Sequence, residues 1–331
     1  MALGVEGTRV GCWTDPTNHT GCTVVLSAPG SQGAIAVRGG APGTREAAAL
    51  GATGNVRECH AVVLSGGSAF GLATADGVVD WCVAQGIGYD KTVAVIPIVG
   101  AAIVFDLRSA DAPRPGRDVG WAACEAATAD DPPQGSVGVG SGCTVGKIGG
   151  LGWGSKGGQG WAVEQAAGIT VGALMAVNAL GDVLDERGDI LAGSRAPAQV
   201  ARYPAATSLG PPPADVDRGP EAAGEPDVDA DADADAALEH TVIGCLVTNA
   251  RLSKPDAVRA ADLAHTGIAR SVSPAHTSMD GDALFLLSAQ QVDASVDLVA
   301  DLGARAVAAA IRSAVRHAEG MPAFPADPRA R

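Results

Sequence analysis

The sequence predicts a layered α/β or α+β body, because short apolar runs with strand character alternate with segments of helical periodicity along its 331 residues. About 47% of the residues are hydrophobic, so the chain can bury a sizeable core and is not globally disordered. Aromatic residues make up only 3%, whereas glycine alone accounts for 45 residues. We therefore expect a core of small aliphatic side chains whose backbones approach closely.

In the N-terminal half, apolar runs separated by glycine-rich turns predict strands. Apolar residues at helical spacing predict a helix over 69–84. The longest uncharged apolar run, 93–105, is too short to span a bilayer and contains Pro97 and Gly100. We interpret it as a buried strand and expect no contact with a membrane. The strands are expected at 22–27, 34–37, 60–64, 93–105 and 169–179.

The composition changes at about residue 196, and the stretch 196–239 is rich in Pro, Ala and Asp. Its part 215–239 holds ten acidic residues and one arginine, so it carries −9 of the chain's net charge of −14. Such a stretch cannot bury enough apolar area to offset its chain entropy, and we expect an exposed, mobile loop. The negative charge also argues against nucleic-acid binding, which requires a basic face.

After this stretch the sequence again predicts regular structure. Ser253, followed by Pro255 and Asp256, has the form of a helix start. Because 241–331 alone would form a thin core, we expect 1–331 to be a single domain into which the acidic loop is inserted. The elements expected here are a strand at 241–247, a helix from 253 to about 270, a strand at 283–288 and an amphipathic helix at 296–317.

No cofactor or metal site is expected from the motifs. The segment from Gly140 to Lys147 resembles a phosphate-binding loop, but it has one residue too many between the glycines, and Ile148 cannot bind Mg²⁺. The six histidines form no HExxH motif, and the seven cysteines are scattered without a CxxC pair. Reduced thiols and the absence of a signal peptide at residues 1–13 predict a cytoplasmic protein.

Thr241 is the most informative single position, because it stands where the acidic loop ends and an apolar strand begins. A self-cleaving enzyme with an N-terminal nucleophile has this layout. A threonine hydroxyl is a poor nucleophile alone, but the α-amino group released by cleavage, of pKa about 7.7–8.0, can activate it. On periodicity alone, the plainer interpretation of Thr241 as a residue that merely begins a strand is the stronger one.

Six motifs, in this order, resemble the DmpA-type L-aminopeptidase/D-esterase family of N-terminal-nucleophile hydrolases. A further segment, HTSMDGDALF at 276–285, is most similar to the nylon-oligomer (6-aminohexanoate oligomer) hydrolase branch of that family. The likeness runs over about 10–190 and 239–290. The six motifs are VRGGAPGTRE (37–46), HAVVLSGGSAFGLATADGV (60–78), IPIVGAAIVFDL (96–107), GSVGVGSGCTVGK (135–147), VGALMAVNALGDVLD (171–185) and IGCLVTNARL (243–252).

The resemblance implies a four-layer αββα sandwich and a symmetric homo-oligomer. It also implies self-cleavage between His240 and Thr241 into chains 1–240 and 241–331, which stay together. The new N-terminal Thr241 would then hydrolyse amide bonds without a metal or cofactor. In this family the residue before the scissile bond is usually Asn, and His240 departs from that pattern. Its side chain need not react, but a histidine could slow cleavage or make it pH-dependent.

The resemblance also assigns four further residues to the catalytic site. The asparagine that stabilises the oxyanion falls on Asn178, and an amide donor of this kind is typically worth about 3–4 kcal/mol. The active-site lysine falls on Lys147, whose ammonium could steady the oxyanion or, when neutral, act as a base. The paired acids fall on Asp280 and Asp282, where they could orient the threonine hydroxyl and amine.

The expected activity is hydrolysis of a short peptide or an amino-acid amide through an acyl-enzyme. Hydrolysis of 6-aminohexanoate oligomers is the alternative that the HTSMDGDALF segment favours. Two other classes stay open at this point. The chain could be an uncleaved, non-catalytic member of the family, for which His240 is the only support. It could also be an acyltransferase that passes the acyl group to an amine instead of water.

Overall fold

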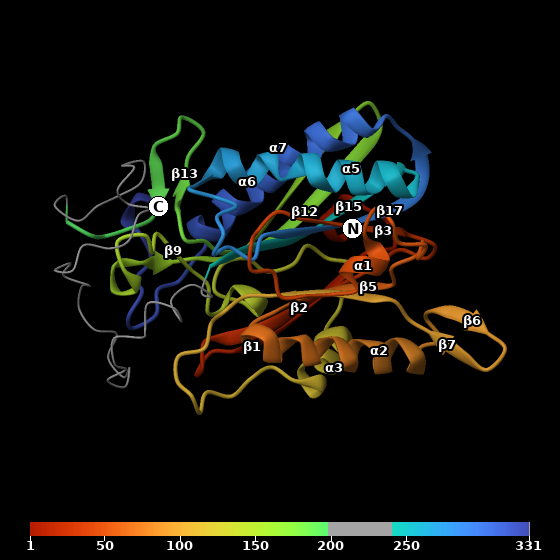
Figure 1. Ribbon diagram of the computed structural model, residues 1–331, viewed down its shortest axis with the longest axis horizontal. Helices are drawn as coiled ribbons and strands as arrows, with labels where there is room; N and C mark the ends of the chain where they lie inside the picture. The colour runs from red at the N-terminus through yellow and green to blue at the C-terminus, as the bar shows by residue number, and fades with distance from the viewer. Residues whose placement is uncertain (198–239, 331) are drawn as a thin grey trace.

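The computed structural model describes residues 1–197 and 240–330, and its elements form four layers (Figure 1). Two five-stranded sheets pack face to face, with α5, α6 and α7 on the outer face of one and α2 and α3 on the outer face of the other. The expected αββα sandwich is therefore confirmed. Most of the predicted acidic loop, 198–239, lies outside the described residues.

The first sheet forms one inner layer and follows the period-two pattern of a buried strand. In β2, Cys22 and Val24 face the helices, whereas Val25 faces the second sheet. Its strands, in spatial order, are β1 (Arg9–Asp15), β2 (Thr20–Leu26), β5 (Ala61–Ser65), β8 (Val99–Ile103) and β4 (Thr44–Arg45). The helices that cover it are α2 (Thr74–Ala84) and α3 (Arg117–Glu125).

The second sheet positions the candidate site. All its neighbouring strands are antiparallel except β15 and β17, which are parallel. Its strands, in spatial order, are β11 (Gly158–Ala166), β12 (Ile169–Asn178), β15 (Thr241–Arg251), β17 (Ala283–Asp293) and β3 (Gln32–Val37). The helices over it are α5 (Lys254–Ala264), α6 (Thr266–Ser271) and α7 (Val296–Arg316).

The two sheets share a core of small and branched side chains, as the composition predicts. Leu174 and Ile243 from the second sheet pack with Val62 and Leu64 from the first. Phe285 adds a large, fully buried ring to this core. It fits because Gly100 faces it, where an ideal Cβ would lie 2.6 Å from a ring carbon.

The helices of the C-terminal half begin as their sequences predict. Ser253 caps α5 by accepting a hydrogen bond from Asp256 N, and Ser295 caps α7 by accepting one from Leu298 N. The prediction of one continuous helix from 253 to about 270 is wrong in one respect, because the segment divides into α5 and α6. Gly267 then lies so close to α7 that an ideal Cβ would be 2.2 Å from a carbonyl oxygen of that helix.

Two other expectations need correction. The segment 93–105 is not one strand, because Pro97 separates β7 (Ala94–Ile96) from the central strand β8. β7 pairs with β6 (Tyr89–Lys91) in a hairpin that projects beside α2 (Figure 1). The helix expected over 69–84 begins with a 3₁₀ turn, Ser68–Ala73, before α2. Short elements that the sequence did not indicate include α1 (Ala47–Leu50), β9 (Thr144–Val145), β10 (Ser155–Lys156), β13 (Asp182–Leu184), β14 (Ile190–Ala192) and β16 (Val272–Ser273).

Candidate active site

The register between β12 and β15 brings Thr241 and Asn178 together. Asn178 is the last residue of β12 and pairs directly with Thr241, the first residue of β15. Both strands lie in the middle of the second sheet (Figure 1), and both side chains are buried. The two residues that the resemblance names as nucleophile and oxyanion-stabilising group are therefore immediate neighbours.

The Asp280-Gly281-Asp282 turn lies on the other side of Thr241. It comes just before β17, and because β17 runs parallel to β15, the turn meets the start of β15. His240 forms a parallel bridge with Asp280, and Gly281 N donates to His240 O at 2.9 Å. An ideal Cβ on Gly281 would lie 2.8 Å from Thr241 Oγ1, so the close approach requires glycine.

The Thr241 hydroxyl contacts the carbonyl of the preceding residue. Its Oγ1 donates a short hydrogen bond to His240 O. That oxygen thus accepts hydrogen bonds both from the hydroxyl and from the Gly281 amide. An attack on the preceding carbonyl needs the hydroxyl beside that carbonyl and a donor on its oxygen, and the structure supplies both.

The two carboxyl groups have different partners. Asp282 Oδ1 accepts from Val242 N at 2.7 Å, directly after the threonine. Asp280 Oδ2 accepts from Thr277 N and from Thr277 Oγ1, each at 2.7 Å. Burial, and after it the negative charge of Asp282, together raise the pKa of Asp280 to about 6.

Lys147 reaches the site from the segment between β9 and β10. Its Nζ lies 3.1 Å from Asn178 O and 3.1 Å from Asn178 Oδ1, and the side chain is only 5% exposed. The backbone of the loop is fixed by a hydrogen bond from Lys147 N to Leu180 O at 2.8 Å. The lysine charge also lowers the pKa of Asp280.

Asn178 itself is held by three further groups. Its Oδ1 accepts from Thr144 N at 2.9 Å and from Thr144 Oγ1 at 3.2 Å, and its Nδ2 donates to Phe105 O at 3.0 Å. The amide group is therefore clamped in one orientation, with its oxygen toward Lys147. In this state Nδ2 donates to a backbone carbonyl, and an oxyanion-stabilising role for it stays a prediction.

Sequence reasoning missed several residues that shape the site. Gly281 acts through its backbone amide, and Thr144 and Phe105 act through contacts with Asn178. His276 contacts Asp282, with Nδ1 2.7 Å from Oδ2. Each of these residues lies inside a motif or segment quoted above, so the motifs located them, but nothing in the residue types indicated their contacts.

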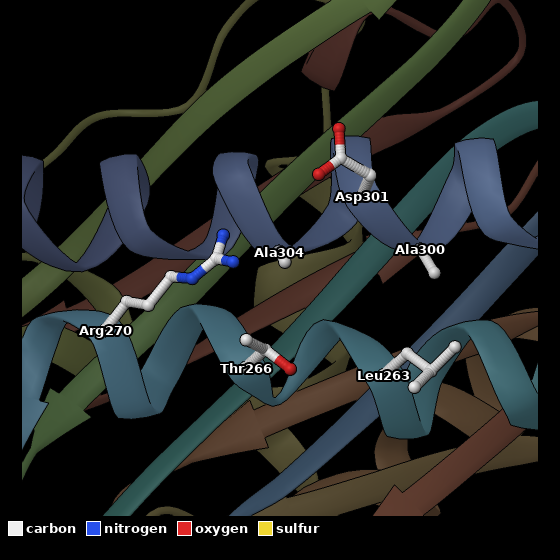
Figure 2. Close-up of a pocket in the computed structure, with 6 residues that line it drawn as sticks. All are labelled: Leu263, Thr266, Arg270, Ala300, Asp301 and Ala304. Carbon is white, nitrogen blue, oxygen red and sulfur yellow. The ribbon is translucent and has the colours of Figure 1, made fainter.

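The described residues contain no cluster of three or more His, Cys, Asp and Glu side chains that could hold a metal ion. In the same part of the chain, no helix is both long enough and apolar enough to cross a bilayer. A shallow surface pocket of about 160 Å³ lies between α5, α6 and α7 and contains none of the site residues (Figure 2). It is lined by Leu263, Thr266, Arg270, Ala300, Asp301 and Ala304.

Comparison with known proteins identifies relatives that cover most of the chain. The sequence model of Peptidase family S58 matches residues 3–327. An uncharacterised aminopeptidase of Mycobacterium tuberculosis is 37% identical over 294 residues, which cover 86% of this chain and 80% of the relative. A 6-aminohexanoate-oligomer endohydrolase of Kocuria sp. is 28% identical over 296 residues, which cover 88% of this chain and 76% of the relative.

Solved structures agree on the fold. The L-aminopeptidase D-Ala-esterase/amidase of Ochrobactrum anthropi, described as a variant of the Ntn-hydrolase fold, matches with a TM-score of 0.68 at 18% identity. The match covers 99% of this chain and 90% of that one. A Burkholderia sp. β-aminopeptidase matches with a TM-score of 0.65 at 19% identity, covering 96% and 86%. With the family match across residues 3–327, these findings show that the chain is a hydrolase of peptidase family S58 with the Ntn-hydrolase fold.

Proposed function

We propose that this protein is a self-cleaving amidohydrolase whose nucleophile is Thr241. The observation that carries the proposal is the pair of hydrogen bonds on the carbonyl of His240. The Thr241 hydroxyl and the Gly281 amide both donate to that oxygen. A threonine that merely began a strand would not need its hydroxyl on the preceding carbonyl, nor a glycine packed against its Oγ1.

Self-cleavage would proceed by an N→O acyl shift. Thr241 Oγ1 attacks the carbonyl carbon of His240, the hydroxyl proton passes to the amide nitrogen of Thr241, and the C–N bond breaks to leave an ester. This step frees the α-amino group of Thr241. Water then hydrolyses the ester, which releases a carboxylate on His240 and restores the Thr241 hydroxyl. The fragments would stay together, because β15 is hydrogen-bonded to β12 and β17 is hydrogen-bonded to β3.

In the mature enzyme the same hydroxyl would attack a substrate amide. The new α-amino group takes the hydroxyl proton and passes it to the leaving amine, and water hydrolyses the acyl-enzyme. Asn178 and the Lys147 ammonium beside it are the groups proposed to stabilise the oxyanion, and Asp280 and Asp282 to orient the nucleophile. Their burial around Thr241 supports these roles, since charge interactions are stronger where water is excluded.

For the substrate we propose short peptides or amino-acid amides. This choice rests on the 37% identity to relatives named as aminopeptidases in Mycobacterium tuberculosis and Mycobacterium leprae. The 6-aminohexanoate-oligomer endohydrolases of Kocuria sp. and Paenarthrobacter ureafaciens, at 28% and 27%, support the alternative. Rates on an amino-acid p-nitroanilide and on a 6-aminohexanoate oligomer distinguish the two, and excess acceptor amine reveals any acyl transfer.

The first test is the intact mass of the purified protein beside that of Thr241→Ala. Cleavage predicts fragments of about 24 and about 9 kDa, in proportion to 240 and 91 of the 331 residues of the 32.7 kDa chain. Thr241→Ala should remain one chain. Thr248→Ala, another buried threonine of β15, is the matched control and should be cleaved. A single chain in the wild type would favour a non-catalytic protein, and cleavage of Thr241→Ala would end the proposal.

A further inference from the structure

Asp282 is held from two sides, and the two sides lead to different parts of the fold. Its Oδ1 accepts from Val242 N, the amide directly after the proposed nucleophile, at 2.7 Å. Its Oδ2 accepts from His276 N at 3.2 Å and lies 2.7 Å from His276 Nδ1. The carboxyl group is 1% exposed. The Asp282 side chain thus connects His276 to the amide of Val242, the residue next to Thr241.

The backbone of His276 adopts the conformation that this contact needs. Its φ is +58°, in the left-handed region that non-glycine residues seldom occupy. In this conformation the amide and the ring Nδ1 of the same residue both reach Asp282 Oδ2. Such conformations cost free energy and persist where the surroundings impose them, often at functional sites.

The imidazole of His276 also contacts a second histidine ring. The ring of His265 lies against it with centroids 5.0 Å apart, and His265 Nε2 is 3.1 Å from Ala36 O on β3. Within the described part of the chain, His276 Nε2 is buried without a hydrogen-bond partner. An unpaired acceptor costs less than an unpaired donor, so the proton belongs on Nδ1, where it is donated to Asp282.

We propose that His276 is a positioning residue that acts through Asp282, and this inference rests on the function proposed above. Its Nδ1–H fixes the rotamer of Asp282, and Asp282 in turn fixes Val242 N and the start of β15. The Thr241 hydroxyl is then held against the carbonyl of His240. Without the imidazole, the carboxyl group can rotate away from Val242, and the nucleophile loses its alignment.

The test compares His276→Ala with His276→Asn. Asn places an N–H donor at the same number of bonds from Cα as Nδ1 and tolerates a positive φ. Self-cleavage of purified precursor is followed over time by intact mass, and kcat and KM are measured on an amino-acid p-nitroanilide per processed site. We expect His276→Ala to lower the cleavage rate and kcat by about tenfold to a hundredfold and to change KM by no more than about twofold. The cleavage rate and kcat of His276→Asn should stay within about threefold of the wild-type values.

Two controls separate positioning from a general loss of stability. His60→Ala removes another buried histidine whose Nδ1 accepts from Ile98 N at 3.0 Å, in the first sheet. It should lower the unfolding temperature without changing kcat per processed site. His276→Gln carries its amide one bond too far out and should be as slow as His276→Ala. If His276→Ala does not fold, equal rates for His276→Asn and His276→Gln overturn the proposal.

The outcomes also distinguish this inference from the proposed function. If Thr241→Ala is still cleaved, the nucleophile is assigned wrongly and the role of His276 falls with it. If wild type is cleaved, Thr241→Ala is not, and His276→Ala matches wild type in both rates, only the inference about His276 is overturned.

Discussion

Asn178 and Thr241 are direct partners across β12 and β15, one at the end of its strand and the other at the start. The chain leaves the sheet at Asn178 and re-enters it beside the same residue. The position of the proposed nucleophile is therefore set by the ladder between these two buried strands. A one-residue slip would turn every side chain of β15 to the opposite face of the sheet. The packing of the buried strand therefore keeps Thr241 opposite Asn178.

The first prediction concerns Gly281. In Gly281→Ala, the new methyl carbon would lie 2.8 Å from Thr241 Oγ1 and 3.0 Å from Ala41 O, so the hydroxyl must move off the carbonyl of His240. Because a misplacement of about 1 Å can cost about a hundredfold in rate, we expect self-cleavage to slow by at least tenfold. Intact mass at a series of times after purification measures the rate.

The matched control for this change is Gly303→Ala in α7. There an ideal Cβ would lie 3.3 Å from Ala264 Cβ, a tight contact that requires a shift of a few tenths of an ångström, and its other neighbours are at 3.7 Å or more. Alanine in place of a helical glycine gains about 0.5–1 kcal/mol, so the variant should be at least nearly as stable as wild type and should be cleaved normally. Equal cleavage of Gly281→Ala and Gly303→Ala would show that the close approach to Thr241 has no role.

A second prediction concerns Lys147. Lys147→Met removes both hydrogen bonds from Nζ to Asn178 while keeping most of the buried stem. Buried hydrogen bonds to a charged group are worth about 1.5–3 kcal/mol, so we expect a loss of about 2 kcal/mol in the free energy of unfolding. Turnover should fall by at least about tenfold if the ammonium supports the oxyanion. Lys91→Met, on the projecting hairpin, should leave turnover unchanged and lower the free energy of unfolding by no more than about 1 kcal/mol, because it loses only an exposed contact with the Tyr89 ring.

How far the sequence predicts the fold depends on the element. Strands with continuous apolar runs, such as β5 and β12, were located within a residue or two because burial on both faces leaves a clear pattern. β11 was missed because its second half is only partly buried and contains Trp161, Glu164 and Gln165. The order of the strands was not predictable, since β3 joins the sheet of β17 through contacts far apart in the sequence.

For the candidate site, the sequence alone singled out one position for attention, and the family resemblance supplied the others. Thr241 stands out because composition changes sharply before it. Asp280 and Asp282 look like an ordinary turn, and only the parallel pairing of β15 and β17 brings them to Thr241. The contribution of Gly281 is a backbone N–H, which every residue except proline carries. No residue type could have indicated that contact.

A third prediction is that self-cleavage speeds up as pH rises through about 6. Burial, and after it the charge of Asp282, raises the pKa of Asp280 to about 6. Cleavage creates an ammonium at Thr241 beside this carboxyl group, and the ionised form stabilises it. An unperturbed imidazole titrates near this range, so His240 is the control residue. A rise that persists in His240→Asn and flattens in Asp280→Asn supports Asp280, and the reverse pattern assigns the titration to the histidine.

The last prediction follows the same carboxyl group into stability. The pKa of Asp280 is raised to about 6 from an ordinary 3.8, so the folded state binds its proton more tightly than the unfolded state. The group's contribution is therefore complete below about pH 4 and is lost as pH rises through about 6. Two pKa units correspond to about 3 kcal/mol.

Thr241→Ala is the background for this measurement, because it is expected to remain a single chain. Its free energy of unfolding from denaturant titration at pH 4, 5, 6 and 7 is compared with that of the double variant that also carries Asp280→Asn. Asp106, whose pKa burial also raises to about 6, titrates in both proteins and cancels in the difference. Between pH 4 and pH 7, the free energy of unfolding of the Thr241→Ala single variant should fall by up to about 3 kcal/mol relative to that of the double variant. A difference that does not change with pH would overturn the prediction, because it would mean that burial beside Asp282 does not alter how Asp280 ionises.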